Sequence, residues 1–223
     1  MFMSKAVVLL SGGLDSTVTL AHCIDDGNEA VALSFRYGQR HTKELDSAKA
    51  VADHYGIKHI ITDIDLSSFR SSLIGNKGEI KKDRKNIGDD IPDTYVPARN
   101  MIMLSVAAGL CESLGAESIY IGANSVDYSG YPDCRKEFFD SFETMMAKGT
   151  KAGVEGHMIK ISTPILDLTK AEIVKLGKTL NAPLHLTWSC YSGGEKACGR
   201  CDSCILRLKG FADAGYKDEV EYE

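Results

Sequence analysis

The sequence has 223 residues, a formal net charge of −5 at pH 7 and seven cysteines. This length corresponds to one main domain with a small appendage. The acidic balance argues against a general affinity for nucleic-acid backbones, and no apolar stretch approaches the roughly 18 residues of a membrane span. The N-terminal apolar run is too short for a signal peptide, so a cytoplasmic protein is expected.

The first predicted strand, residues 6–10, is a valine-rich apolar run typical of buried parallel strands. It leads into Ser11-Gly12-Gly13-Leu14-Asp15-Ser16 (the phosphate loop), and a helix is expected over residues 15–26. The two glycines let the backbone turn sharply and approach a ligand, and Asp15 or Ser16 can cap the helix. The unpaired N–H groups and the helix dipole then favour an anion. The loop therefore predicts a site for nucleotide phosphates, although no lysine follows Gly13 as it would in P-loop ATPases.

Strands and helices alternate along the rest of the chain. Apolar runs and spacings of three and four residues predict, in order, a strand at 29–35, a helix at 41–55, a strand at 58–64, a helix at 97–114, a strand at 117–122, a helix at 135–149 and a strand at 158–161. This alternation is typical of a doubly wound parallel α/β sheet. Thr169 and Glu172 have the spacing of a capping box at the start of a further helix.

Residues 66–95 interrupt the pattern with a polar stretch that has no apolar period. A stretch of this length in a compact domain is a lid, a binding segment or locally mobile. Its basic run at residues 81–85 is expected to be a solvated turn, with contact to phosphates as the alternative. Cys23 and Cys111 lie on apolar helix stripes and are expected in the core.

A second polar segment, residues 123–135, follows the predicted strand at 117–122. Ligands of open α/β sheets bind at the carboxyl ends of the strands, which is also the edge that carries the phosphate loop. We therefore expect this segment to contact a second substrate.

Four cysteines, Cys190, Cys198, Cys201 and Cys204, crowd into one short C-terminal segment. Their spacing, Cys-x7-Cys-x2-Cys-x2-Cys, suits a closed tetrahedral zinc site, which leaves no position for a catalytic water. We expect a structural zinc that fixes a segment over residues 181–223 to an ATP-binding domain over residues 1–180. An iron–sulfur cluster or free thiols are the alternatives.

The phosphate loop resembles that of the N-type ATP pyrophosphatases, in which it holds the departing pyrophosphate. Together with residues 95–100, residues 127–135 and the four cysteines, it makes nearly the whole chain similar to the 7-cyano-7-deazaguanine synthases, nitrile-forming enzymes of queuosine biosynthesis. Ala98 departs from the glycine expected in many relatives and should tighten the turn beside Arg99. The resemblance implies a fold of the adenine nucleotide α-hydrolase type and, as a further expectation, a homodimer.

The resemblance also implies a reaction that converts 7-carboxy-7-deazaguanine, free ammonia and ATP with Mg²⁺ into the 7-cyano compound. The ATP contacts implied are Leu9, Leu10, Ser11, Gly12, Gly13, Leu14, Asp15, Ser16, Thr17, Val18 and Thr19. The residues implied for catalysis are Asp15, Arg99 and Lys170. Of these, Arg99 and Lys170 would stabilise developing negative charge, or else make ordinary surface ion pairs.

A deazaguanine base carries an N–H and an amino group side by side, for which a carboxylate is a bidentate acceptor. Asp127 or Asp133 is the expected carboxylate, with Ser129 nearby. Tyr128 or Tyr131 would stack on the ring, and Arg135 would bind the substrate carboxylate. Asp133 alone could instead cap the next helix.

Three other functions are consistent with a phosphate loop of this type or with the combination of the loop and the four cysteines. An RNA-modifying thiolase would adenylate a tRNA base and would need a basic surface and a reactive cysteine near the ATP. A nucleotide sensor held together by zinc would bind ATP without releasing pyrophosphate. The third alternative is an NAD or GMP synthetase activity, which substrate screening would distinguish from the deazaguanine synthase activity.

Overall fold

A five-stranded, fully parallel sheet forms the centre of the molecule, with the strand order β3-β2-β1-β4-β5. The computed structural model describes residues 4–75, 80–84, 94–126 and 131–223. The strands are β1 (Lys5–Leu9), β2 (Glu29–Arg36), β3 (Lys58–Asp63), β4 (Ser118–Ile121) and β5 (Lys160–Ser162). The strand order reverses beside β1, which confirms the predicted doubly wound sheet and places a ligand crevice at its carboxyl edge.

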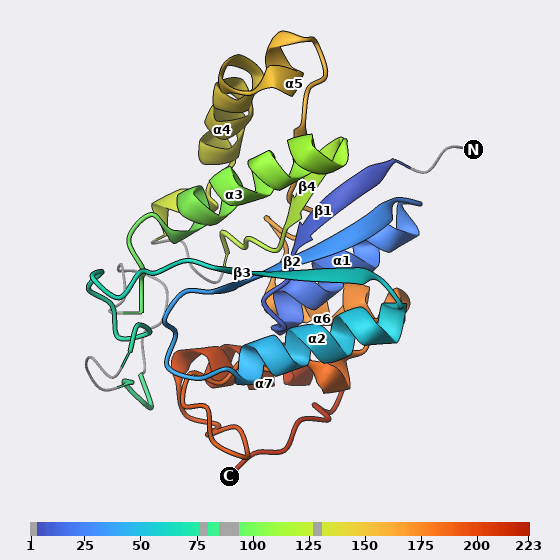
Figure 1. Cartoon of the computed structure of the whole chain (residues 1–223). Coiled ribbons are helices and arrows are strands. Elements are labelled where there is room, and N and C mark those ends of the chain that lie inside the picture. The colour runs from blue at the N-terminus through green and yellow to red at the C-terminus, as the bar shows by residue number, and fades with distance from the viewer. Residues whose placement is uncertain (1–3, 76–79, 85–93, 127–130) are drawn as a thin grey trace.

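Helices cover both faces of this sheet (Figure 1). They are α1 (Leu14–Asp25), α2 (Lys43–Tyr55), α3 (Arg99–Leu114), α4 (Lys136–Gly149), α5 (Lys151–Val154), α6 (Lys170–Thr179) and α7 (Asp202–Ala214), with single 3-10 turns η1 (Pro132–Cys134) and η2 (Leu184–Leu186). In the view of Figure 1, α3 and α4 lie above the sheet, and α1, α2, α6 and α7 lie below it.

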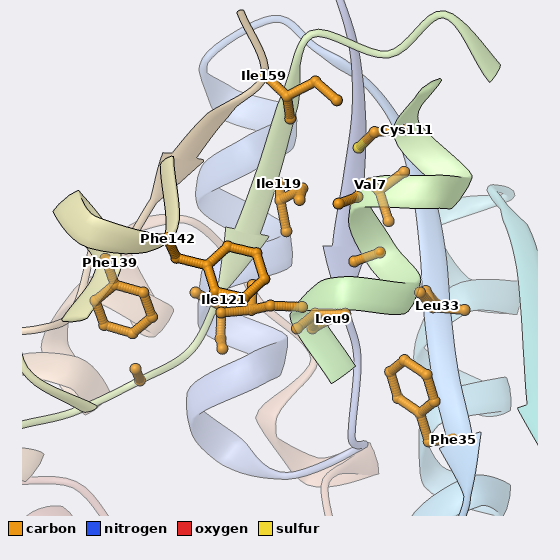
Figure 2. Close-up of a cluster of buried hydrophobic side chains, with 14 of the residues drawn as sticks. Val7, Leu9, Leu33, Phe35, Cys111, Ile119, Ile121, Phe139, Phe142 and Ile159 are labelled. Carbon is orange, nitrogen blue, oxygen red and sulfur yellow. The ribbon is translucent and has the colours of Figure 1, made fainter. Parts of the chain in front are cut away.

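The alternation of side chains along β1 divides the core into two layers. Val7 and Leu9 face a cluster that includes residues of α3 and α4, among them Phe139 and Phe142 (Figure 2). Ala6, Val8 and Leu10 face the opposite layer, where they pack with residues of α1 and α2. Because both faces of β1 are covered, its sequence is a continuous apolar run rather than an alternating one.

Helices α6 and α7 form a further layer that packs on α1. Ile173 and Val174 of α6, Val18 of α1 and Phe211 of α7 are almost completely buried in one cluster. The predicted capping box is confirmed, because Thr169 Oγ1 accepts a hydrogen bond from Glu172 N and the Glu172 carboxylate accepts one from Thr169 N.

Three predicted elements begin two residues later than expected, the first being the helix predicted from residue 41, which begins at Lys43. The helix predicted from residue 97 begins at Arg99, because Ala98 takes a left-handed conformation with φ of 54°. The strand predicted at residues 158–161 lies at Lys160–Ser162. Cys23 and Cys111 are fully buried in the core, as predicted.

The described part of the basic run is not only a solvated turn. Lys82 makes a β-bridge with Cys201, and the half-buried Arg84 forms an ion pair with Asp202 at 2.9 Å. Asp83 N donates to Arg200 O at 2.8 Å. These contacts attach residues 82–84 to the segment that carries the four cysteines.

None of the helices in the described ranges is both long and apolar enough to cross a membrane.

Candidate active site and metal centre

The phosphate loop connects β1 to α1 at the reversal point of the sheet, beside the end of β4. Gly122, which follows β4, packs against the end of the phosphate loop: a Cβ atom on Gly122 would lie 2.9 Å from Ser16 N. Gly12 has φ of 83°, and a Cβ atom on it would lie 2.2 Å from Glu44 O, the first turn of α2. The loop therefore tolerates no side chain at Gly12, and α2 packs directly against it.

Hydrogen bonds within the loop hold its shape. Ser16 Oγ accepts from Ser11 N at 3.2 Å and donates to Gly13 O at 3.2 Å. The predicted capping by Asp15 or Ser16 is wrong, because the N-cap residue of α1 is Gly13, which has no side chain. This cap leaves the helix N-terminus accessible to an anion, which is the chemistry the sequence predicted.

A cavity of about 270 Å³ opens at this loop. Most of the predicted ATP contacts line it, namely Leu9, Leu10, Ser11, Gly13, Leu14, Asp15 and Ser16. Thr17, Val18 and Thr19 are instead fully buried in α1.

Asp15 and Lys170 lie together on one wall of the cavity. Lys170 Nζ donates to Asp15 Oδ1 at 2.7 Å and to Oδ2 at 2.8 Å, and both side chains are largely buried. Lys170 is the first residue of α6, and the capping box at Thr169 fixes where that helix begins. Two residues that are far apart in the sequence thus form one charged pair at the phosphate loop.

Arg99, Glu44, Tyr37 and Tyr131 line another part of the cavity. Burial acts to lower the pKa of Arg99, but its electrostatic interactions with the neighbouring Tyr37, Tyr131, Tyr191 and Cys134 together outweigh it and raise the pKa. The guanidinium is therefore always charged. Burial raises the pKa of Glu44 to about 7, against the opposing effect of Arg99. The cavity therefore presents a permanent cation beside a carboxylate.

Asp133 has a structural role in this arrangement. It is buried, and its Oδ2 accepts from the backbone N–H of Asn100 at 3.1 Å in the first turn of α3. Asn100 Nδ2 donates to Asp133 O at 3.1 Å and to Cys134 Sγ at 3.3 Å. Asp133 thus fixes the start of α3, the helix that carries Arg99, and not the next helix, α4, which the capping alternative from the sequence had expected; the N-cap residue of α4 is Arg135.

Of the other residues predicted to bind the substrate, the structure places one in the cavity lining and one outside it. Tyr131 lines the cavity, with its ring 5.5 Å from that of Tyr95. Arg135 is exposed at the start of α4 and is not part of the cavity lining. Asp127, Tyr128 and Ser129 lie outside the described residues, so their predicted roles stay predictions.

Cys134 also lines the cavity but is not set up as a nucleophile. Burial, with a contribution from Asp133, raises the pKa of its thiol to about 11. The neutral thiol is a weak nucleophile at neutral pH, because the thiolate is the reactive form.

The four cysteines near the C-terminus form one buried cluster. The sulfur atoms of Cys190, Cys198, Cys201 and Cys204 all lie within 4.8 Å of one another. A tetrahedral shell with Zn–S bonds of about 2.3 Å needs sulfur–sulfur separations of about 3.8 Å, which this cluster can reach with small adjustments. Cys190 Sγ accepts backbone hydrogen bonds from Ser192 at 3.4 Å and Cys198 at 3.3 Å. Such N–H donors stabilise the thiolates that metal ions require.

Trp188 joins this metal centre to the phosphate loop. Its backbone N–H donates to Gly12 O at 2.9 Å, and its indole N–H donates to Cys190 O at 2.9 Å. Lys43 Nζ lies 4.1 Å from the centre of the indole ring and donates to the carbonyl oxygens of Gly194 and Glu195. The two hydrogen bonds of Trp188 therefore link the cysteine cluster directly to the phosphate loop.

The sequence predictions missed Glu44, Tyr37 and Trp188. Glu44 and Tyr37 lie in or just after the turn that leaves β2, whose carboxyl end meets the same edge as the phosphate loop. The position of residues 36–44, directly after a parallel strand, is the signal in the sequence that points to this part of the cavity. No signal of this kind was available for Trp188, because its role depends on how the C-terminal segment packs.

Comparisons with known proteins agree with this architecture. The family model described as queuosine biosynthesis protein QueC matches residues 5–215. The chain is 54% identical over 222 residues to the 7-cyano-7-deazaguanine synthase of Picrophilus torridus, covering 99% of this chain and 92% of that protein. It is 53% identical to the protein of that name in Acetivibrio thermocellus, covering 99% and 98% of the two chains. A solved 4-thiouridine synthetase–RNA complex with bound ATP has a TM-score of 0.51 and 19% identity over 98% of this chain and 47% of that one. This last likeness shows the fold alone.

Proposed function

The chain belongs to the QueC family of queuosine biosynthesis proteins, and we propose that it is the ATP-dependent ligase that converts 7-carboxy-7-deazaguanine and ammonia into 7-cyano-7-deazaguanine. The observation that carries this proposal is the identity of over half the residues, along nearly the whole chain, to synthases of that name. The cavity supports it, because it combines a phosphate-binding loop with a cation and a carboxylate beside it.

The first step activates the substrate carboxylate. One carboxylate oxygen attacks the α-phosphorus of ATP, the bond to the pyrophosphate oxygen breaks, and an acyl adenylate forms. The N–H groups at the start of α1 hold the leaving pyrophosphate, and Lys170 neutralises the charge that develops on it. Mg²⁺ bound with ATP would supply further charge neutralisation, and Asp15, whose oxygens otherwise accept hydrogen bonds from Lys170, would be its carboxylate ligand in the loop.

Ammonia then attacks the activated carbonyl carbon and AMP leaves with one substrate oxygen, which gives an amide. A second ATP is attacked in the same way by the amide oxygen, and loss of that oxygen in a second AMP leaves the nitrile. The chain's contribution is to orient the two reactants and to stabilise the negative charge. Arg99, which is charged and faces the cavity, is positioned for the second of these tasks.

We also propose zinc as the metal of the four-cysteine cluster. The four soft, buried sulfur donors fit a closed Zn²⁺ shell, which would be structural. On this basis residues 181–223 form a segment that a metal ion fixes to the ATP-binding domain, as the sequence predicted.

The RNA-modifying alternative is less consistent with the site. A thiolase would need a reactive cysteine beside the ATP, whereas the Cys134 thiol has a raised pKa and hydrogen bonds with Asn100. The net charge of −5 also provides no general attraction for tRNA.

Mass spectrometry of the products tests the proposal. The protein is incubated with ATP, Mg²⁺, ammonium and 7-carboxy-7-deazaguanine, and a mass corresponding to the nitrile is expected. Asp15→Ala should abolish it. Unchanged substrate after incubation with intact, metal-loaded protein would overturn the assignment.

A further inference from the structure

The described cavity lining contains two acidic side chains, Asp15 and Glu44. Asp15 is already engaged, because both of its oxygens accept hydrogen bonds from Lys170 Nζ. The carboxylate of Glu44 accepts no hydrogen bond from the residues that the structure describes, nor does it form an ion pair with Arg99 there. Among the residues that the structure describes, Glu44 is therefore a half-buried carboxylate that faces the cavity without a hydrogen-bond or ion-pair partner.

A carboxylate held in this way is costly unless something pairs with it, since burying an unpaired charge opposes folding. Within the described ranges, no protein hydrogen bond to the Glu44 carboxylate relieves this cost. This pattern indicates a group that is satisfied by a ligand.

The position of Glu44 places that ligand next to the reacting phosphate. Its own backbone oxygen packs against Gly12 of the phosphate loop, and Arg99 lies close enough to influence its charge. Tyr37 and Tyr131 complete this part of the wall with aromatic surface. A flat, aromatic ligand with hydrogen-bond donors on one edge fits these neighbours.

Resting on the proposed function, we propose that Glu44 is the residue that selects the base, by accepting hydrogen bonds from the ring N–H and the adjacent amino group of 7-carboxy-7-deazaguanine. Arg99 then faces the next groups along the same edge, the ring carbonyl oxygen and the 7-carboxylate. The adjacent ring N–H and amino group of the substrate match the two oxygens of the Glu44 carboxylate. The ring carbonyl oxygen and the substrate carboxylate beside it match the paired N–H groups of the Arg99 guanidinium.

The adenine of ATP is a poorer match for this carboxylate. Its Watson–Crick edge places an amino donor next to a ring nitrogen that accepts, so the ionised form of Glu44, which predominates above its raised pKa of about 7, pairs with one group and repels the other. Glu44 therefore distinguishes the acid substrate from the nucleotide that binds in the same cavity.

The test compares Glu44→Gln with Asp46→Asn, a control that removes the same charge from the same first turn of α2 at an exposed position. Glu44→Gln replaces one acceptor by a donor, which faces a donor on the substrate. We expect kcat/KM for 7-carboxy-7-deazaguanine to fall about 30- to 300-fold while the KM for ATP changes less than about threefold. Asp46→Asn should change neither constant.

An analogue of the acid that lacks the 2-amino group distinguishes recognition of the base from a purely structural role of Glu44. A structural role would lower kcat/KM for both compounds equally and leave the preference between them unchanged. The unaltered protein should prefer the amino compound by about 10- to 100-fold in kcat/KM, and Glu44→Gln should lose most of this preference. Asp46→Asn should keep it. Loss of the preference in Asp127→Asn but not in Glu44→Gln, or a rise in the KM for ATP alone, would overturn the proposal.

Calorimetric binding of 7-carboxy-7-deazaguanine separates this inference from the proposed function. Unaltered protein that neither binds nor converts the acid would contradict both. Unaltered protein that makes the nitrile, together with a Glu44→Gln variant that binds the acid as tightly, would contradict only the role of Glu44.

Discussion

Lys170 Nζ lies 2.7 Å from Asp15 Oδ1, so the first residue of α6 neutralises the one carboxylate of the phosphate loop. Because Lys170 is only 11% exposed and Asp15 24% exposed, this is not an ordinary surface pair. The pair holds a cation beside the helix N-terminus where the triphosphate is proposed to bind.

Lys170→Met should reduce nitrile formation by about 10²- to 10³-fold, as expected when one charge-stabilising donor is removed from a reaction centre. It also leaves Asp15 without its partner at the loop. Steady-state measurement of pyrophosphate release gives kcat and the KM for ATP. Lys175→Met, on the exposed face of α6, is the matched control and should be unchanged. A Lys170→Met variant with unaltered kcat would exclude a role for this lysine in catalysis.

Gly210→Ala should displace the side chain of Lys170, because Gly210 packs directly against it. A Cβ atom at Gly210 in α7 would lie 2.3 Å from Cγ and 2.8 Å from Cβ of Lys170. We expect a loss of about 1–3 kcal/mol in the free energy of unfolding, together with reduced activity, because the side chain must move. Gly109→Ala, in an open position of α3, should instead stabilise by about 0.4–1 kcal/mol. Urea unfolding of both variants checks this, and equal effects would contradict it.

The Arg207–Asp218 ion pair should make the stability of the C-terminal segment sensitive to acid. Both side chains are almost fully buried, and Arg207 Nε lies 2.7 Å from Asp218 Oδ2. Burial acts to raise the pKa of Asp218, but hydrogen bonds from Arg207 and Tyr222 outweigh it and hold the pKa below its usual value. A lowered pKa in the folded state stabilises the protein above the unfolded pKa of about 3.9, and this contribution is lost as the pH falls below it.

Asp218→Asn should therefore cost about 3–5 kcal/mol at pH 7, because it leaves Arg207 buried without a charged partner. The difference from the unaltered protein should shrink below about pH 4, where Asp218 becomes protonated first in the unfolded chain and, at still lower pH, in the folded protein. Urea unfolding at pH 7, 5 and 3.5 measures it. A difference that is the same at all three pH values would show that the pair contributes nothing through its charge.

Removal of the metal should weaken the nucleotide site as well as the fold. Trp188 connects Gly12 to Cys190, so loosening the cysteine cluster releases one support of the phosphate loop. We expect one zinc per chain by elemental analysis, and a chelator should lower both the unfolding temperature and the affinity for ATP. Chelated protein that keeps its full ATP affinity would show that Trp188 does not transmit the effect of the metal. Iron with acid-labile sulfide would instead favour the alternative cluster.

Much of the fold could be predicted from the sequence, because the local signals agree with the tertiary structure. The apolar run of β1 is covered on both faces, and the capping box at Thr169 forms as its spacing indicated. The four cysteines also meet as predicted, since the close spacing of Cys198, Cys201 and Cys204 leaves only Cys190 to be brought in by the fold.

The cavity wall was harder to predict, because it is assembled from contacts between distant segments. Glu44 reaches the site only because Gly12 lets α2 pack against the phosphate loop. Asp133 resembled a ligand group in the sequence, but in the structure it holds Asn100 at the start of α3. The homodimer and the roles of Asp127, Ser129 and Arg135 stay predictions.

The central claim is that an oxygen of the substrate attacks the α-phosphorus of ATP held at the phosphate loop. Substrate labelled with ¹⁸O in both carboxylate oxygens tests it most directly. We predict that mass spectrometry will find an unlabelled nitrile and one ¹⁸O atom in each AMP produced. Label in inorganic phosphate with release of ADP would place the attack on the terminal phosphate and contradict the account.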